Sequence, residues 1–484
     1  MSFLRKFTGD AVVYGLGKGI KKFIGFFLLP FYARALSPAE YGILETLGTF
    51  IFFIVVFLNL GLDSASGFYF FQPHDDKERG RILFTVFIIR LLTIVPAIIL
   101  SLFSEQISIL LFNSTQYTTV VLVTCLLLPV NVITSEQELI YRFNRQPWKY
   151  NILTIIKSLF NITAGIILVV KLDFGVLGAQ LASLLSGLAV VIFSFLIYTR
   201  KKYTYEFSFA WAKKLLRYGF PLIFAGIAVW VYQSSDRYFL LYYQNLTDIG
   251  YYSIGSKFSQ PLGIINMAVQ MSWGVLFYEI YNREKNKEKV ESKNALTTLV
   301  KFYVTTAVVL SFVLSLYSKE IVGLVATEKF LPGITVIPVL LFSAILAQLI
   351  QIIGVGITIS ERTIIFTYII IVSALVNLGL NFVFVPLLSF YGAALTTLIA
   401  YFVNLILHYR FSQKYFRVHF EMAKLVILFF IFLIVSTIIP YFEINGGYMF
   451  SLPLKILVFS IMLFVPFGLK LIAINDIKKI LNIS

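Results

Sequence analysis

The chain contains few charged residues, few histidines and almost no cysteine. Charged residues make up 13% of its 484 residues, and it has three histidines and one cysteine, Cys125. A soluble chain would carry roughly twice this share of charge. A single cysteine excludes an intrachain disulfide and a cysteine-ligated metal cluster. His74, His408 and His419 fall at the ends of apolar segments or in loops, which gives little support to a histidine metal centre.

Motifs of the common enzyme classes are also absent. The sequence has no Walker-type GxxxxGK[ST], no HExxH and no GxSxG pattern. Glu136 and Glu138 are two residues apart and therefore lie on different faces of a helix. Local ion pairing with Arg142 and Arg145 explains them better than catalysis. The polar joints are too short to hold a folded domain outside the membrane, so we expect a protein that is not an enzyme.

Long apolar segments take up most of the chain. Hydrophobic residues account for 59% of it, and the mean hydropathy is +0.87. About 20 mainly apolar residues cross a bilayer as a helix. The sequence therefore predicts an all-α polytopic membrane protein with about 14 transmembrane helices. The expected spans are 8–34, 42–66, 82–103, 117–141, 150–170, 175–199, 214–242, 249–277, 295–317, 333–359, 363–386, 390–409, 422–440 and 451–472.

Lysine and arginine lie almost entirely in every second loop between these spans. An excess of Lys and Arg in short loops marks the cytoplasmic side of a membrane. The pattern predicts that both termini are cytoplasmic. It also explains the net charge of +16, because the charge is spread over loops that face anionic headgroups. We therefore do not expect nucleic acid as a partner.

The sequence resembles itself at a shift of about 210 residues. The segment 36–42 (LSPAEYG) is similar to 246–252 (LTDIGYY), and Gly178-Ala179 is similar to Gly392-Ala393. Six spans separate the matched elements, which indicates a parallel repeat. The repeat predicts an N-terminal six-helix lobe over 1–205, a C-terminal six-helix lobe over 206–415 around a central cavity, and two additional helices over 416–484.

Three lysines lie near the middle of the first expected span. Lys18, Lys21 and Lys22 share one helix face, because they are three and four residues apart. Each lysine at the centre of a membrane helix costs about 2.5–3.5 kcal/mol on insertion scales, so the face is expected to line a water-filled cavity. In the alternative, the span begins near residue 23 and the lysines are a cytoplasmic anchor. The segment left before Ser37 would then be too short to cross comfortably.

Further charges lie within the expected spans. The cations are Arg34, Arg90, Lys157, Arg237 and Lys257, and the acids are Asp63 and Asp236. Since Asp236 and Arg237 are neighbours in sequence, we expect them to point in different directions and to need other partners. Some of the arginines could reach the interface instead. The interior is net positive, which favours an anionic substrate.

The segment 33–42 (ARALSPAEYG) and the duplicated halves resemble the Wzx-type polysaccharide flippases of the multidrug/oligosaccharidyl-lipid/polysaccharide (MOP) exporter superfamily. The resemblance implies two lobes that line a V-shaped cavity in the bacterial cytoplasmic membrane. It implies movement of an undecaprenyl-diphosphate-linked oligosaccharide to the outer leaflet, coupled to H⁺ or Na⁺, with no other cofactor. The implied partners are this lipid-linked oligosaccharide, membrane lipids, a polysaccharide polymerase and glycosyltransferases.

The resemblance also suggests roles for the charged residues. Related lipid II flippases carry two basic residues in helix one. The first matches Lys22 and the second matches Leu28, so the departure favours a polysaccharide branch. The hypothesis assigns diphosphate binding to Lys18, Lys21, Lys22, Arg237 and Lys257, and coupling or ion pairing to Asp236, Asp63, Arg34, Arg90 and Lys157.

Three other functions stay open at this point. A MATE-like multidrug exporter would capture organic cations with buried carboxylates, which this interior has in short supply. A membrane-embedded polymerase or glycosyltransferase would need a larger loop outside the membrane. A scaffold for glycan enzymes gives no reason for lysines at the middle of the membrane.

Overall fold

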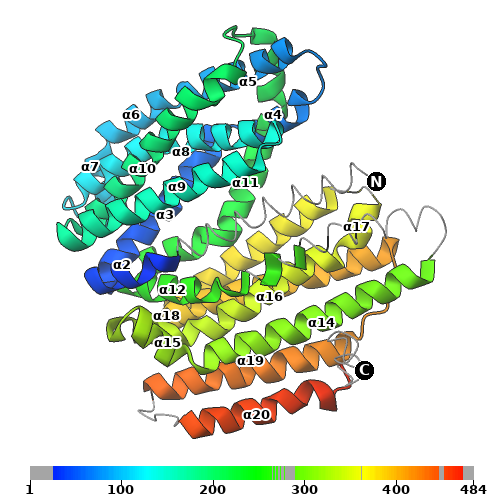
Figure 1. The fold of residues 1–484 in the computed structure, drawn as a ribbon. Coiled ribbons are helices and arrows are strands. Elements are labelled where there is room, and N and C mark those ends of the chain that lie inside the picture. The colour runs from blue at the N-terminus through cyan, green and yellow to red at the C-terminus, as the bar shows by residue number, and fades with distance from the viewer. Residues whose placement is uncertain are drawn as a thin grey trace. The chain divides into compact units, whose positions relative to one another are not determined.

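The computed structural model describes residues 26–263, 289–360, 362, 364–445 and 452–471, with a few single positions between 265 and 277. All regular secondary structure in these residues is helical (Figure 1). Ten helices among them are long and apolar enough to cross a membrane. The predicted fold class, an all-α polytopic membrane protein, is confirmed.

The chain divides into two compact units, Met1–Gly250 and Tyr251–Ser484. This boundary reflects compactness, whereas the predicted lobes follow the sequence repeat and stay a prediction. The first unit holds α2 (Leu29–Ala35), α3 (Pro38–Asn59), α4 (Leu62–Phe70), α5 (Asp76–Leu91), α6 (Ile94–Leu102), α7 (Ser104–Phe112), α8 (Thr118–Phe143), α9 (Pro147–Gly165), the π-helical turn η1 (Ile166–Lys171), α10 (Gly175–Ile197), the 3₁₀ turn η2 (Thr199–Lys202) and α11 (Phe209–Tyr243).

The second unit begins within α12 (Leu246–Ser259). It continues with α14 (Lys289–Leu316), α15 (Ser318–Val325), the 3₁₀ segment η3 (Glu328–Val336), α16 (Ile337–Ile353), α17 (Val355–Ile359), α18 (Ile364–Tyr415), α19 (Met422–Asn445) and α20 (Leu452–Gly468). Ser389 interrupts α18 with a φ of 51°, so α18 is two helices joined at a kink. The kink lies between the expected spans 363–386 and 390–409.

One central helix organises each unit. In the first unit, α8 packs against α3, α5, α6, α7 and α10, and 67% of its apolar window is buried. In the second, α16 packs against α14, α18 and α19, and 78% of the window that includes it is buried. The other long helices surround these two and expose apolar side chains, as expected for a protein that faces lipid.

Matching caps begin α3 and α12. The Ser37 hydroxyl accepts a hydrogen bond from the Glu40 backbone N–H at 3.2 Å, and the Glu40 carboxylate accepts one from the Ser37 N–H at 2.8 Å. The Asn245 amide oxygen accepts a bond from the Asp248 N–H at 2.9 Å in the same way. Such caps satisfy N–H groups that a helix start leaves free. These two caps align at a shift of 208 residues, close to the shift of about 210 at which the sequence resembles itself.

Two glycines, Gly42 and Gly250, are also 208 residues apart. A Cβ on Gly42 would lie 1.9 Å from the Leu246 carbonyl oxygen, and a Cβ on Gly250 would lie 2.0 Å from the Pro38 carbonyl oxygen. The two contacts are reciprocal at the same shift of 208 residues. The first turns of α3 and α12 therefore approach closely only because both positions are glycine.

Candidate functional site

Two transmembrane segments of the first unit are interrupted side by side. Between α3 and α4, Leu60 and Gly61 adopt left-handed φ values of 50° and 66°. Between α5 and α6, the helix kinks at Leu92 and Thr93, whose dihedral angles stay in the right-handed helical region. Pro96 explains this kink, because its ring clashes with the Leu92 carbonyl and it has no N–H to donate. Non-helical backbone at membrane depth persists only where protein buries it or where it lines a cavity.

Gly61 is required by both its conformation and its neighbour. A Cβ there would lie 2.2 Å from the Gly219 carbonyl oxygen on α11, and a Cβ on Gly219 would lie 2.2 Å from the Leu60 carbonyl oxygen. L side chains rarely adopt the positive φ of Gly61. The break therefore lies directly against α11, whose own Pro221 follows two residues after Gly219.

Arg90 is fully buried between the left-handed turn and the kink. It is in the last turn of α5, near the middle of the 27-residue candidate span Asp76–Leu102, and its side chain is 0% exposed. Its guanidinium donates to the Val132 carbonyl on α8 and to the Asn59 amide oxygen on α3, each at 3.0 Å. It also forms an ion pair with Asp63 in the first turn of α4. One side chain thus ties together α3, α4 and α8.

Asp63 gathers the donors on the other side of this ion pair. Besides Arg90, its carboxylate accepts hydrogen bonds from the Asn59 amide at 3.0 Å and from the Ser135 hydroxyl at 3.2 Å. Its side chain is 37% exposed, whereas Arg90 is not exposed at all. Asp63 is therefore the member of the ion pair that reaches the accessible surface, whereas the guanidinium does not.

Glu136 adds a second carboxyl group to the cluster. It lies next to Ser135 on α8, and the charges of Arg90 and Asp63 both act on it. One of its carboxyl oxygens accepts a hydrogen bond from the Tyr203 hydroxyl at 3.1 Å. Glu136 Oε2 and Arg90 Nε are buried and have no hydrogen-bond partner among the residues that the structure describes. We name Asn59, Asp63, Arg90, Ser135, Glu136 and Tyr203 the Arg90 cluster.

Tyr203 comes to this cluster from the loop between α10 and α11. Burial raises the pKa of its phenol, and the Glu136 carboxylate raises it further. Tyr203 therefore stays protonated and donates its proton in the hydrogen bond to Glu136. Phe70, Leu83 and Ile140 pack around its ring. This packing holds the loop between α10 and α11 in place and thereby positions the Tyr203 hydroxyl as a donor to Glu136.

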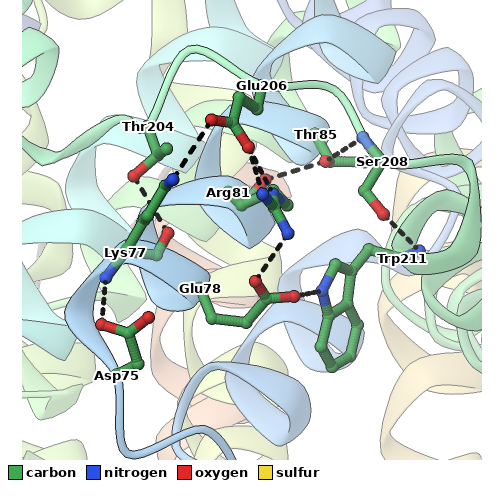
Figure 2. A network of polar contacts seen from close by, with 9 residues as sticks. All are labelled: Asp75, Lys77, Glu78, Arg81, Thr85, Thr204, Glu206, Ser208 and Trp211. Atoms are coloured by element: carbon green, nitrogen blue, oxygen red, sulfur yellow. Dashed lines mark hydrogen bonds and ion pairs between the residues drawn. The ribbon is translucent and has the colours of Figure 1, made fainter.

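A polar network holds the same loop against the start of α5 (Figure 2). Arg81 bonds Glu206 of the loop and donates to Glu78 at 2.9 Å, and Glu78 accepts from the Trp211 indole N–H. Arg81 and Lys77 lower the pKa of the Glu206 carboxyl, with the hydrogen bond from Arg81 as the largest cause. We name this network, drawn in Figure 2, the loop clamp.

The clamp also includes backbone contacts. The Thr204 hydroxyl donates to the Lys77 carbonyl at 2.9 Å, and the Ser208 N–H donates to the Thr85 hydroxyl at 3.2 Å. These bonds join residues more than 120 positions apart in the sequence. Their combined effect is to set the position of Tyr203 beneath Glu136.

The structure brings together only some of the residues predicted for the site. Asp63 and Arg90 form a direct ion pair. Lys18, Lys21 and Lys22 lie outside the described residues. Arg34 is exposed in the last turn of α2, Lys157 is half-buried on α9, and Lys257 is half-buried in the last turn of α12.

Asp236 and Arg237 pair with each other, and Arg237 also donates to the Gln233 carbonyl at 3.3 Å. The Arg237 guanidinium turns back and contacts the Asp236 carboxylate at 3.1 Å, and the Arg237 backbone N–H donates to the same oxygen at 2.9 Å. The arginine side chain is long enough to reverse direction within one turn, which the angle between neighbouring Cβ atoms does not reveal. Asp236 is buried on α11, so the pair lies inside the first unit.

Sequence reasoning missed Glu136 as a member of the site. Pairing with Arg142 or Arg145 was expected, but its partners are the Tyr203 hydroxyl and the charge of Arg90. Asn59, Ser135 and Tyr203 were not singled out either. One indication was available, because Asn59 and Asp63 flank a Leu-Gly break within an apolar span. No indication was available for Tyr203, because its role depends on how the loop between α10 and α11 folds back toward α8.

A second buried cation lies in the second unit. Lys455 on α20 is 0% exposed and contacts Glu320 on α15 at 2.6 Å and Glu443 on α19 at 2.9 Å. Its ammonium donates to both oxygens of Glu320, which is 50% exposed, and pairs with Glu443, which is buried. This group joins the last two helices to the rest of the second unit.

Comparisons with known proteins agree with this geometry. The family model described as polysaccharide biosynthesis protein matches residues 7–277. A Haemophilus influenzae protein of the Lsg locus is 26% identical over 285 residues, which cover 57% of this chain and 67% of that protein. An uncharacterised membrane protein of the same organism is 23% identical, and the match covers 54% of this chain and less than two thirds (62%) of the relative.

Solved structures show the same fold. The lipid II flippase MurJ in an inward closed conformation has a TM-score of 0.69 at 18% identity, covering 94% of this chain and 98% of that chain. An inward-facing multidrug resistance transporter of the MATE family, from the MOP superfamily, has a TM-score of 0.65 at 14% identity, covering 84% and 97%.

The expected resemblance is therefore confirmed. The family match spans more than half of the chain, and the fold is that of MOP-superfamily flippases and transporters over nearly all of it. The chain belongs to the polysaccharide biosynthesis protein family and is a membrane protein with the MOP flippase and transporter fold.

Proposed function

We propose that this protein is a flippase that moves a polyprenyl-diphosphate-linked oligosaccharide repeat unit from the cytoplasmic to the outer leaflet. The observation that carries the proposal is the Arg90 cluster, a buried set of charges between a left-handed turn and a helix kink, in a member of a polysaccharide biosynthesis family. Broken helices with charged groups at membrane depth are typical of transporters. The proposed protein works without covalent chemistry on its cargo.

The cargo's diphosphate is assigned to the cations of the first span. Lys18, Lys21 and Lys22 supply point charges suited to phosphate, and Arg237 and Lys257 act as further contacts. The Asp236 carboxylate already holds Arg237 at 3.1 Å. In this proposal the diphosphate competes with Asp236 for the guanidinium, so cargo binding loosens an ion pair on α11.

The Arg90 cluster is proposed as the coupling device, with H⁺ as the ion. It contains one guanidinium and two carboxyl groups, so a single proton on Asp63 or Glu136 brings it to neutrality. The 37% exposure of Asp63 gives that proton a way in. A neutral cluster costs less to bury than a charged one, and the proton therefore favours the state in which the cluster is most enclosed. Arg34 and Lys157 are left as ion-pairing residues in this scheme.

The setting follows from the same scheme. The protein is placed in the bacterial cytoplasmic membrane with both termini in the cytoplasm, as the distribution of Lys and Arg indicates. Its cargo comes from glycosyltransferases on that side and leaves to a polysaccharide polymerase on the other. Membrane lipids surround it throughout.

Lipid analysis of a deletion strain tests the function. We expect one oligosaccharide-loaded polyprenyl diphosphate to accumulate, as measured by mass spectrometry, with loss of surface polymer. Expression of the wild-type chain should clear the lipid, and a chain with Lys22→Ala should be inserted normally and fail to clear it. An unchanged lipid pool with intact surface glycan would contradict the proposal and favour drug export.

A further inference from the structure

A cavity of about 670 Å³ lies at one end of the first unit. It forms where the loops between α4 and α5, between α8 and α9, and between α10 and α11 come together. Its charged lining consists of Lys77, Arg79, Arg145, Lys201 and Lys202, with Asp76 as the carboxylate. Ligand pockets of proteins typically measure about 300–1,000 Å³. Size and charge both indicate a site for an anion.

Close packing and hydrogen bonds fix the walls of the cavity. A Cβ on Gly80 would lie 2.4 Å from the Thr204 hydroxyl and 2.8 Å from its backbone nitrogen, so the start of α5 touches the loop only because residue 80 is glycine. The loop clamp of Figure 2 holds the same two segments, with Thr204 donating to the Lys77 carbonyl. Both lining segments are therefore fixed relative to each other before any ligand binds.

Only part of the positive charge is neutralised within the protein. Arg79 pairs with Asp76 at 3.1 Å and donates to the Pro73 carbonyl at 3.0 Å. Lys77 lies 3.5 Å from Glu206, which Arg81 also holds. Five cations line the space against one lining carboxylate. Like charges held together repel, and an anion between them removes that cost.

The rest of the lining combines the polar residues Asn144 and Thr204 with an aromatic side. Phe70 and Phe143 stack with ring centroids 4.9 Å apart, and Leu83 and Tyr203 complete this side. A ligand that fits has a charged part and a hydrophobic part. Inorganic phosphate alone would leave the aromatic side of the cavity without a contact.

Exposed aromatic side chains place this end of the unit at a membrane surface. Trp148 is 67% exposed just after the loop between α8 and α9, and Phe209 is 83% exposed just after the loop between α10 and α11. Aromatic side chains gather where headgroups meet water. Basic pockets at that level between transmembrane helices bind lipid headgroups.

We propose that this cavity binds the phosphate headgroup of an anionic bilayer phospholipid, as a site separate from the cargo path. The cations hold the phosphate and the aromatic side receives the start of the acyl chains. Tyr203 lines the cavity and donates to Glu136 of the Arg90 cluster. Occupancy therefore stabilises the loop that supplies this hydrogen bond, and lipid composition affects the coupling device.

Titration of purified protein with lipid, followed by native mass spectrometry, tests the site. The full chain in detergent is titrated with phosphatidylglycerol, with phosphatidylcholine as the uncharged comparison. We expect phosphatidylglycerol to bind, and the double variant Lys201→Gln/Lys202→Gln to bind it about tenfold or more weakly. The matched control is Lys213→Gln/Arg217→Gln, which removes the same charge from exposed positions on α11 outside the lining. It should bind as the wild type does.

Two further measurements separate the sources of phosphate. Undecaprenyl diphosphate and inorganic diphosphate are titrated against bound phosphatidylglycerol, and we expect neither to displace it at equal concentration. Binding of undecaprenyl diphosphate with no binding of phosphatidylglycerol would overturn the assignment to bilayer lipid. Equal affinity for phosphatidylglycerol in all three chains would overturn the site itself.

Folding of each variant is checked by its elution from a sizing column. Should the double variant aggregate, Arg145→Gln takes its place, because Arg145 is an exposed loop residue of the lining. Loss of one cation should weaken binding several-fold. Wild-type affinity in that variant would contradict the proposal.

Discussion

Among the described residues, each unit buries one cation completely, and the two cations have different partners. Lys455 in the second unit meets two carboxylates, those of Glu320, which is 50% exposed, and of Glu443, which is buried. Arg90 in the first unit meets one carboxylate that is 37% exposed, and its Nε has no acceptor in the described part of the chain. A guanidinium with an unused N–H is able to change partners.

Both cations lie near an interruption of a helix, and the interruptions differ in kind. Lys455 joins α15, α19 and α20, and its ammonium lies 5.7 Å from the ring centroid of Tyr317, the turn residue between α14 and α15. Arg90 lies between the left-handed turn at Leu60–Gly61 and the kink at Leu92–Thr93. Its neighbourhood therefore combines an N–H that has no acceptor among the described residues with a left-handed turn. We infer that the Lys455 group has a structural role and that the Arg90 cluster serves transport.

Replacing both members of an ion pair should separate the two roles most strongly. With Arg90→Met/Asp63→Leu, we expect normal insertion and complete loss of surface glycan, because the charges are removed without leaving either one unpaired. With Lys455→Met/Glu443→Leu, we expect glycan export to continue, since apolar residues of similar size replace a structural ion pair. Surface glycan is measured in a deletion strain carrying each chain.

Two results would break this comparison. If glycan export continues in the Arg90→Met/Asp63→Leu variant, the Arg90 cluster is not required for transport. Loss of export in Lys455→Met/Glu443→Leu, at wild-type protein levels in the membrane, would show that both ion pairs serve transport.

Removal of only one partner should mainly affect stability at Lys455. Lys455→Met leaves Glu443 buried without its cation, which costs about 3–5 kcal/mol in the free energy of unfolding. The loss is measured by denaturant or thermal unfolding in detergent. Adding Glu443→Leu should restore most of it, because the stranded charge is removed. Failure of that rescue would mean that Lys455 stabilises through packing alone.

Glu136→Gln should change the pH dependence of transport more than stability. The amide keeps the size of the side chain and still accepts from Tyr203, but it cannot bind or release a proton. We expect transport to fall about tenfold, because the amide oxygen accepts a hydrogen bond that is weaker than that of a carboxylate by about 1–1.5 kcal/mol. The remaining transport should vary less with pH than that of the wild type.

Tyr203→Phe is the companion change. It removes the hydrogen bond to Glu136 and leaves the carboxyl group able to titrate. Transport measured in vesicles should therefore keep its pH dependence, with the midpoint moved toward higher pH because a donor that favours the carboxylate is gone. Identical pH profiles for Glu136→Gln and the wild type would exclude Glu136 as the proton carrier.

The fold class could be predicted from the sequence, whereas the site could be predicted only in part. Apolar segments of about 20 residues have few ways to satisfy their backbone in a membrane, so span positions follow from hydropathy. Asp63 and Arg90 stood out because charge at membrane depth is rare. Tyr203 and Glu136 did not, since their contact depends on a loop that folds back under α8.

The omissions have the same physical origin. The matching caps Ser37 and Asn245 were missed because they are chemically equivalent without being identical. The partner of Asp236 was missed because side-chain length decides it. Long-range packing and flexible side chains are the parts that local patterns do not encode.

The smallest effect is expected at a half-buried ion pair near the surface of the second unit. Glu421, in the loop before α19, pairs with Lys301 on α14 and with Lys424. These bonds, first that of Lys301, lower the pKa of the Glu421 carboxyl to about 2. Its contribution to stability is therefore complete above the ordinary carboxyl pKa of about 4.3 and is lost as the pH falls toward 2.

Glu421→Gln measures that contribution directly. A surface pair contributes about 0.2–1 kcal/mol, so the variant should unfold slightly more easily than the wild type at pH 7 and equally easily near pH 2. Export should not change, because the pair lies away from the broken helices of the first unit in the sequence and belongs to the other unit. A difference in stability that stays constant from pH 7 to pH 2 would mean that packing of the side chain, rather than its charge, is what Glu421 contributes.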